Sequence, residues 1–258
     1  SDLEEKSAKD TLSGATFGIG HTRWATHGVP NDVNSHPHFS NSGKLVIVHN
    51  GIIENYQPIK QRLLKEGYVF HSDTDTEVLV NFIEYIKNKK QLPLEEAVRY
   101  ALNEVVGAYA IAVMEEDHPS KMVVARLGSP LVIGIGKNEF YIASDASPFI
   151  EYTQNALYLE DGEMATIELN QEVQVRKIHN NEEVDPTIQE LKLSIDAIEK
   201  GGYEHFMLKE IFEQPQSIQD TMRGRLLEDH TTKISGINNN LKQFLSADRI
   251  VIVACGTS

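Results

Sequence analysis

The chain has 258 residues, of which 40% are hydrophobic and 24% charged, enough for one large domain or one domain with part of another. Its 38 acidic residues outnumber 24 basic ones, and the net charge of -14 argues against nucleic acid or an anionic membrane as partner. The single cysteine, Cys255, excludes a disulfide framework, and no apolar run approaches the about 20 residues of a membrane span, so we expect a cytoplasmic protein.

The polar first residues predict a surface segment that leads into a buried strand. Ser1 and Glu4 stand at the spacing of a helix capping box, so we expect a helix over residues 1–13. Thr16–Gly20 predicts a buried strand. It leads into a loop, residues 20–51, which holds five of the chain's ten histidines and its only tryptophan.

Helical patterns dominate the next part of the chain. Thr74 and Glu77 stand at capping-box spacing directly before an apolar stripe of helical period, which predicts a helix. Similar stripes precede and follow it. The expected helices cover residues 52–66, residues from about 74 onward, and residues 94–106, with a short strand at Tyr68–Phe70.

From Ala108 onward the hydrophobic period changes to two, the period of a strand. Lys137–Asn138 is a candidate hairpin turn. The expected strands cover residues 108–114, 122–126, 131–135, 140–143, 164–169 and 173–178. Helices followed by a series of strands predict an α+β fold, in which helices are layered on largely antiparallel sheets.

The composition changes near residue 181, which predicts a domain boundary. Beyond it we expect an amphipathic helix from about Phe206, interrupted at Pro215. The final apolar run, Ile250–Ala254, is typical of a strand buried on both faces of a parallel sheet. The expected parts are a first domain over residues 1–180, a linker over 181–202, and the start of a second domain over 203–258.

Arg23 and Asp75 are candidates for holding the two ends of an amino acid. A guanidinium group fits a carboxylate through two parallel hydrogen bonds, and a carboxylate can hold an ammonium group. A structural ion pair is the alternative for Arg23. For Asp75 the alternative is an acidic residue favoured at a helix N-terminus, and both explanations can hold. Together the pair predicts a pocket for a zwitterionic amino acid.

Asn50 and Gly51 follow the apolar run Leu45–Val48, and two interpretations remain open. The pair is the commonest two-residue hairpin turn. Alternatively, a strand delivers it to a tight turn, where the Asn50 side-chain amide and the Gly51 N–H form an oxyanion hole. The helix-like segment that follows weakens the hairpin interpretation.

The loop histidines raise the question of a metal site. They lack the helical pair and the cysteine spacing of dedicated sites, so we expect hydrogen-bonded structural groups and no metal. His27 and His36 could still contact substrate. The residues considered are His21, His27, His36, His38 and His49, with Asp32 as a carboxylate ligand.

The last residues of the chain follow a strand of the type found in parallel sheets. Such strand ends bind ligands, and the small hydroxyl residues Thr257 and Ser258 beside Cys255 would suit a phosphate group. An ordinary turn between a strand and a helix explains the same residues.

Several of these stretches together resemble the class II glutamine amidotransferases. The stretches are GHTRWATHG at 20–28, SHPH at 35–38, HNGIIEN at 49–55 and SDTDTE at 72–77. Three more favour the members that aminate a sugar phosphate: GSPLVIG at 128–134, MLKEIFEQP at 207–215 and ACGTS at 254–258. The resemblance covers nearly the whole chain.

The resemblance implies a four-layer αββα fold of the N-terminal-nucleophile type and no cofactor. An N-terminal cysteine, with its own α-amino group as base, would attack the side-chain amide of glutamine to give a thioester and ammonia. The ammonia would pass to a sugar isomerase domain and aminate fructose 6-phosphate to glucosamine 6-phosphate, in a homo-oligomer.

The motifs also imply roles for individual residues. Arg23 would hold the glutamine carboxylate and Asp75 its ammonium group, while Asn50 and Gly51 would form the oxyanion hole. The other implied site residues are Thr26 and His27 in the pocket wall with His36 nearby, Trp24 gating the ammonia channel, and Thr257 and Ser258 with Cys255 at the sugar-phosphate loop.

One departure from the family qualifies this expectation. The family begins with a cysteine followed by Gly-Ile, whereas this chain begins Ser1-Asp2-Leu3. We therefore expect the nucleophile, the first strands and most of the isomerase domain to be missing, and the chain as given not to hydrolyse glutamine. The alternatives are a glutamine-binding or docking module without catalysis and, as a third hypothesis, a histidine-rich metallohydrolase.

Overall fold

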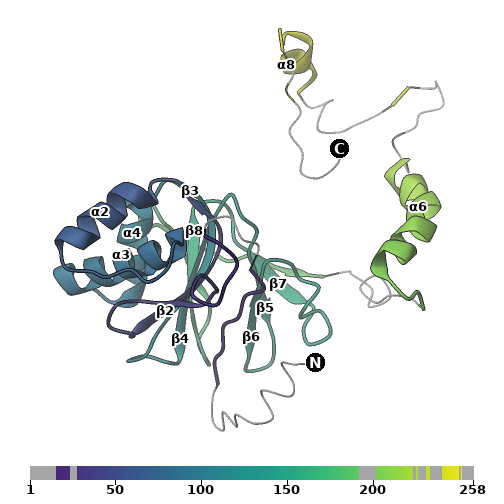
Figure 1. The fold of residues 1–258 in the computed structure, drawn as a ribbon. Coiled ribbons are helices and arrows are strands. Elements are labelled where there is room, and N and C mark those ends of the chain that lie inside the picture. Colours follow the sequence, from purple (N-terminus) through teal and green to yellow (C-terminus); the bar gives the residue numbers. More distant parts are fainter. Residues whose placement is uncertain are drawn as a thin grey trace. The chain divides into compact units, whose positions relative to one another are not determined.

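The computed structural model describes residues 16–23, 28–191, 202–222, 225, 231–232, 240–249 and 251. The chain forms two compact units, residues 1–193 and 194–258. The first unit holds two β-sheets and a layer of helices, whereas the described part of the second holds helices α6 and α8 (Figure 1).

The helices of the first unit follow the predicted apolar stripes. They are α2 (Tyr56–Lys65), α3 (Asp75–Lys90) and α4 (Leu94–Glu104). The α3 helix begins as its capping pattern predicts, because the Thr74 side chain accepts a hydrogen bond from the Glu77 N–H. The α2 helix starts later than expected, since Ile52 and Ile53 belong to the preceding strand.

The strands of the described residues form one sheet of seven and one of four, and the predicted antiparallel α+β arrangement is confirmed. Every ladder between neighbouring strands is antiparallel. The larger sheet has the order β1 (His38–Phe39), β2 (Leu45–Ile53), β3 (Gly107–Glu115), β4 (Lys121–Leu127), β8 (Glu163–Glu168), β9 (Gln174–Lys177), β10 (Glu183–Val184). The smaller has the order β11 (Ile188–Glu190), β7 (Asn155–Tyr158), β5 (Val132–Ile135), β6 (Phe140–Ala143).

The central strands are buried on both faces, and alternate residues belong to two different cores. On β3, Ile111 and Val113 pack with the helices, while Ala110 and Ala112 pack with residues of the smaller sheet. Within the first unit, the described residues therefore form three layers, helix, sheet and sheet (Figure 1). Within the described ranges, no helix has both the length and the apolar composition that a membrane span requires.

Two predicted strands are wrong. Tyr68–Phe70 has no regular secondary structure, because the Asn41 side chain bonds the backbone of Val69 as a partner strand would: its Nδ2 donates to the Val69 carbonyl at 2.6 Å and its Oδ1 accepts from the Val69 N–H at 2.7 Å. Thr16–Gly20 is also irregular, although Phe17 and Ile19 pack against the core between the sheets.

The first unit extends beyond the domain end predicted at residue 180. Glu183–Val184 pairs with β9 of the larger sheet, and Ile188–Glu190 pairs with β7 of the smaller one. The expected linker therefore begins with two edge strands. Their short, polar sequences gave no strand pattern, because an edge strand need not bury either face.

In the second unit, α6 (Phe206–Met222) begins where the sequence predicts, and α8 covers Leu241–Leu245. The predicted interruption at Pro215 is wrong, since the helix continues through that residue. Proline removes one backbone hydrogen bond, but its fixed φ matches that of a helix. The helix expected over residues 1–13 and, apart from Val251, the strand expected over 250–254 lie outside the described residues.

Candidate active site

A cavity of about 210 Å³ in the first unit brings together five of the predicted substrate-binding and oxyanion residues, namely Arg23, His36, Asn50, Gly51 and Asp75. They come from separate segments: the loop before β1, the second half of β2 and the first turn of α3. The remaining lining residues are His21, His49, Ile52, Thr74 and Thr76. A cation, a carboxylate and polar strand residues thus surround one space.

The Arg23 side chain is oriented by its own loop. Its two terminal nitrogens donate to the carbonyl oxygens of Gly28 at 3.2 Å and Val29 at 3.3 Å. The backbone of Arg23 has a positive φ of 52°, an uncommon conformation for a residue with a side chain. Arg23 lines the cavity, and these contacts fix the position of its guanidinium group within the adjoining loop.

Asp75 is the first residue of α3, and its side chain is buried, with 3% exposed. Its Oδ2 accepts a hydrogen bond from the Ile53 N–H at 2.7 Å, which ties the helix N-terminus to the end of β2. The helix dipole favours a negative charge at this position. Asp75 also lines the cavity, so the two explanations offered for it are compatible.

Asn50 and Gly51 lie within β2 and not in a turn, so both the hairpin and the expected tight turn are wrong. The strand continues to Ile53, and Gly51 pairs with Tyr109 of β3. Gly51 has φ +123°, and a Cβ added there would lie 2.0 Å from the Ala108 carbonyl oxygen. Glycine alone permits this close approach of the two strands.

Thr76 connects two histidines that line the pocket with it. Its hydroxyl lies 3.0 Å from His36 Nε2 and 2.9 Å from His49 Nδ1. Burial lowers the pKa of His36 to about 3, and the nearby charges of His21, His38, His49 and Arg23 act in the same direction. His36 is therefore a neutral hydrogen-bonding group at neutral pH.

The histidine contacts fit the expected structural role. His38 Nε2 lies 3.1 Å from the Thr74 hydroxyl, and His21 Nε2 bonds the Asn50 side-chain oxygen. Burial also lowers the pKa of His38. In the part of the chain that the structure describes, no group of three or more histidine, cysteine and acidic residues could hold a metal ion.

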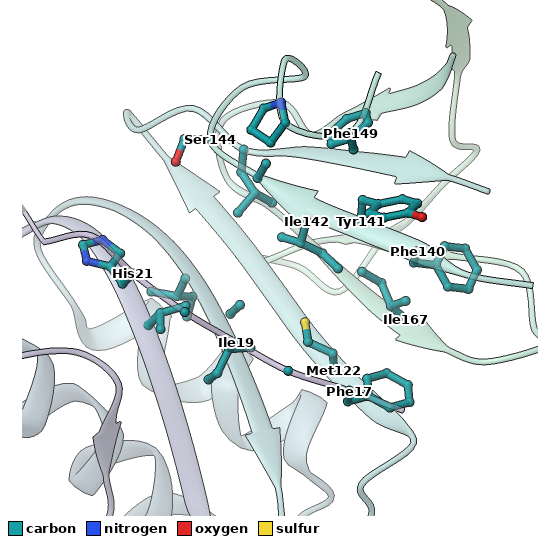
Figure 2. Close-up of a pocket in the computed structure, with 18 of the residues that line it drawn as sticks. Phe17, Ile19, His21, Met122, Phe140, Tyr141, Ile142, Ser144, Phe149 and Ile167 are labelled. Carbon is teal, nitrogen blue, oxygen red and sulfur yellow. The ribbon is translucent and has the colours of Figure 1, made fainter. Parts of the chain in front are cut away.

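A larger cavity of about 600 Å³ lies between the two sheets. Its walls are mainly apolar, and Figure 2 shows Phe17 and Ile19 on one side with Ile142 of β6 opposite. His21 and Asn50 line both cavities, so they stand between the polar pocket and this apolar space.

Six predicted site residues, Trp24, Thr26, His27, Cys255, Thr257 and Ser258, lie outside the described residues. Conversely, Thr76 and Ser144 contact site residues but were not singled out from the sequence. Thr76 directly follows Asp75 in the SDTDTE stretch, which was an available signal. Ser144 bonds Asn50 from 94 residues away, and no local pattern connects them.

Comparison with known proteins identifies relatives of this chain. The chain is 52% identical over 259 residues to the glutamine–fructose-6-phosphate aminotransferase (isomerizing) of Bacteroides thetaiotaomicron, and 53% identical over 262 residues to that of Chlorobaculum tepidum. Each match covers 100% of this chain and 42% of the relative, so the chain spans less than half the length of these relatives.

A solved structure supports the fold. Glutamine phosphoribosylpyrophosphate amidotransferase from B. subtilis, complexed with ADP and GMP, matches with a TM-score of 0.51 and 29% identity, over 62% of this chain and 34% of that one. A family model described as a glutamine amidotransferase domain matches residues 7–203. Since that model covers most of the sequence, the chain belongs to the glutamine amidotransferase domain family.

Proposed function

We propose that the 210 Å³ cavity binds glutamine and positions its side-chain amide for hydrolysis. The observation that carries this proposal is the arrangement of Arg23, Asp75, Asn50 and Gly51 around one cavity. Residues that suit the carboxylate, the ammonium group and the amide oxygen of one amino acid come from three separate chain segments, and independent structural roles would not require a shared space.

Electrostatics support the assignment of the two ends. In a chain with a net charge of -14, an anionic group needs a local cation, and Arg23 supplies a forked one. The buried Asp75 carboxylate suits an ammonium group, because opposite charges interact more strongly where water is excluded. These contacts would select a free amino acid over a glutamine residue inside a peptide.

The reaction needs a nucleophile in addition to this pocket. We assign it to an N-terminal cysteine of the full-length protein, distinct from Cys255, with its own α-amino group as base, as the family resemblance implies. Its thiolate would attack the amide carbon, the negative charge on the oxygen would face Asn50 and Gly51, and ammonia would leave. Water would then hydrolyse the thioester to glutamate. Thr26, His27 and Trp24 would complete the pocket.

The relatives' names extend the proposal to a whole protein that transfers this ammonia to fructose 6-phosphate and forms glucosamine 6-phosphate. In such a protein, residues 203–258 would begin the sugar isomerase domain, with Cys255, Thr257 and Ser258 at its sugar-phosphate loop. A homo-oligomer in the cytoplasm is part of the same proposal.

The substitution Asp75→Asn in the full-length protein tests the pocket. An asparagine oxygen can still accept the Ile53 N–H, but the negative charge is lost. Losing a charged hydrogen bond costs about 1.5–3 kcal/mol, so we expect the glutamine KM to rise about tenfold or more, with a smaller change in kcat. The measurement is glutamate release as a function of glutamine concentration.

Asp73→Asn is the matched control, because Asp73 lies two positions away and is exposed. Its KM should equal that of the unsubstituted protein. An unchanged KM in Asp75→Asn would remove this carboxylate from substrate binding. Glutamine binding without glutamate release in the full-length protein would favour the alternative of a binding module.

A further inference from the structure

The amide group of Asn50 is held on both sides by residues from distant parts of the chain. Its oxygen bonds His21 Nε2, and its nitrogen donates to the Ser144 hydroxyl at 2.8 Å. His21 belongs to the segment before Arg23, and Ser144 directly follows β6 of the smaller sheet. Figure 2 shows these two side chains at the same end of the larger cavity.

The protonation of His21 follows from a third contact. The backbone N–H of Arg23 donates to His21 Nδ1 at 2.9 Å, so in the neutral ring Nδ1 is the acceptor and Nε2 carries the hydrogen. His21 therefore donates through Nε2, and the partner atom on Asn50 must be its oxygen. This fixes which way round the amide lies.

We propose that His21 and Ser144 are positioning residues that keep the Asn50 amide nitrogen directed toward the reacting carbonyl of glutamine. This inference depends on the proposed function. An amide nitrogen carries two N–H groups. One goes to Ser144, and the other is the donor for the oxyanion.

The arrangement also connects the two ends of the substrate site. The peptide N–H that sets the His21 tautomer belongs to Arg23, the residue assigned to the glutamine carboxylate. Placement of the Arg23 backbone and orientation of the Asn50 amide are thus parts of one hydrogen-bond chain. If the amide rotated by half a turn, an oxygen would face the developing negative charge and repel it.

The test compares substitutions in the full-length protein. Ser144→Ala and His21→Leu each remove one restraint, and we expect each to lower kcat for glutamate release about tenfold, the effect of one lost hydrogen bond, while the glutamine KM stays within about threefold. Ser144→Thr keeps the hydroxyl and His21→Gln keeps an N–H near the Nε2 position, so both should restore most of kcat.

Matched controls and a background variant separate positioning from damage to the fold. Ser120→Ala and His179→Leu change the same residue types at exposed positions and should leave kcat unchanged. In an Asn50→Ala background, Ser144→Ala should add no further loss of kcat, because the group it positions is absent. A purely structural role would still lower kcat in that background.

The outcomes distinguish this inference from the proposed function. If Asn50→Ala lowers kcat while Ser144→Ala and His21→Leu do not, the inference is wrong and the oxyanion role of Asn50 stands. A rise in KM at unchanged kcat, or an equal loss in the Asn50→Ala background, would also overturn it. If Asn50→Ala itself leaves kcat unchanged, the proposed function fails. Ser144 is exposed, so its alanine variant should fold even if His21→Leu does not.

Discussion

A single hydroxyl group, that of Thr76, lies between two imidazole rings beside the candidate site. It has one hydrogen to donate, so only one of its two neighbours can accept from it. At least one ring must therefore donate its own N–H to the Thr76 oxygen, which has two lone pairs and can accept from both rings. The contacts at 3.0 Å to His36 and 2.9 Å to His49 thus exclude an arrangement in which both rings are acceptors.

The close approach of β2 and β3 at Gly51 gives the first prediction at this scale. In Gly51→Ala the new Cβ would meet the Ala108 carbonyl oxygen at 2.0 Å, at φ +123°. The strand must shift, and its N–H moves with it. We expect kcat for glutamate release to fall by about tenfold or more, and the melting temperature to fall as well.

Gly43→Ala is a suitable control for that change. Gly43 also has a positive φ, +78°, but an added Cβ there meets nothing within 4 Å. It should show only the conformational cost of about 1 kcal/mol and an unchanged kcat. Equal effects of the two substitutions would show that the contact with Ala108 does not matter.

The low pKa of His36 gives a second prediction, on stability as a function of pH. In the folded chain the ring stays neutral down to about pH 3, whereas in the unfolded chain it titrates near 6.5. Between about pH 6.5 and about pH 3, His36 therefore binds a proton in the unfolded state but not in the folded state. Protonation of this ring therefore does not reduce the free energy of unfolding above about pH 6.5. It reduces that free energy progressively as the pH falls from about 6.5 toward about 3.

Replacing the ring should make the melting temperature less sensitive to acid. Between about pH 7 and about pH 5 we expect the melting temperature of His36→Gln to fall less than that of the unsubstituted protein. Some dependence should remain, because burial lowers the pKa of His38 too. Parallel curves for the two proteins would show that His36 titrates normally in the folded chain.

At the scale of the elements, the sequence predicted those whose own residues carry the necessary pattern. The α3 helix has an apolar stripe and a cap at Thr74, and the β5–β6 hairpin has its turn at Lys137–Asn138 between alternating runs. Both patterns are local. The strand expected at Tyr68–Phe70 failed because a distant side chain, Asn41, bonds the Val69 backbone.

The same reasoning explains how much of the site was predictable. Charged or glycine residues within distinctive motifs, such as Arg23, Asp75 and Gly51, were found, and they line one cavity. The orientation of Asn50 was not predictable, since it depends on Ser144 from a strand end far along the chain. The location of Asn50 inside β2 was missed because the glycine that follows it, Gly51, usually signals a turn.

At the scale of the whole first unit, the last two described strands of the sequence each form one edge of a sheet. β10 pairs with β9 through Glu183↔Arg176 and Val184↔Val175, and β11 pairs with β7. After β11, the Leu191 N–H donates to the Gln154 carbonyl at 2.7 Å. Residues 183–191 thus pair with β9 and β7, which would otherwise be the exposed edges of the two sheets. The sequence predicted a linker over these residues.

This arrangement predicts where the unit can be shortened. A chain that ends at Leu193 keeps both edge strands, whereas one that ends at residue 180 leaves the edges of β9 and β7 unpaired. Several backbone hydrogen bonds are then lost at about 0.5–1.5 kcal/mol each, so we expect the shorter chain to melt about 5 °C or more below the longer one. It should also aggregate more readily, since unpaired edges template the pairing of further chains. Thermal melting and size-exclusion chromatography of the two chains, with upstream sequence identical in both, measure these effects. Equal melting temperatures would mean that residues 181–193 are a linker after all.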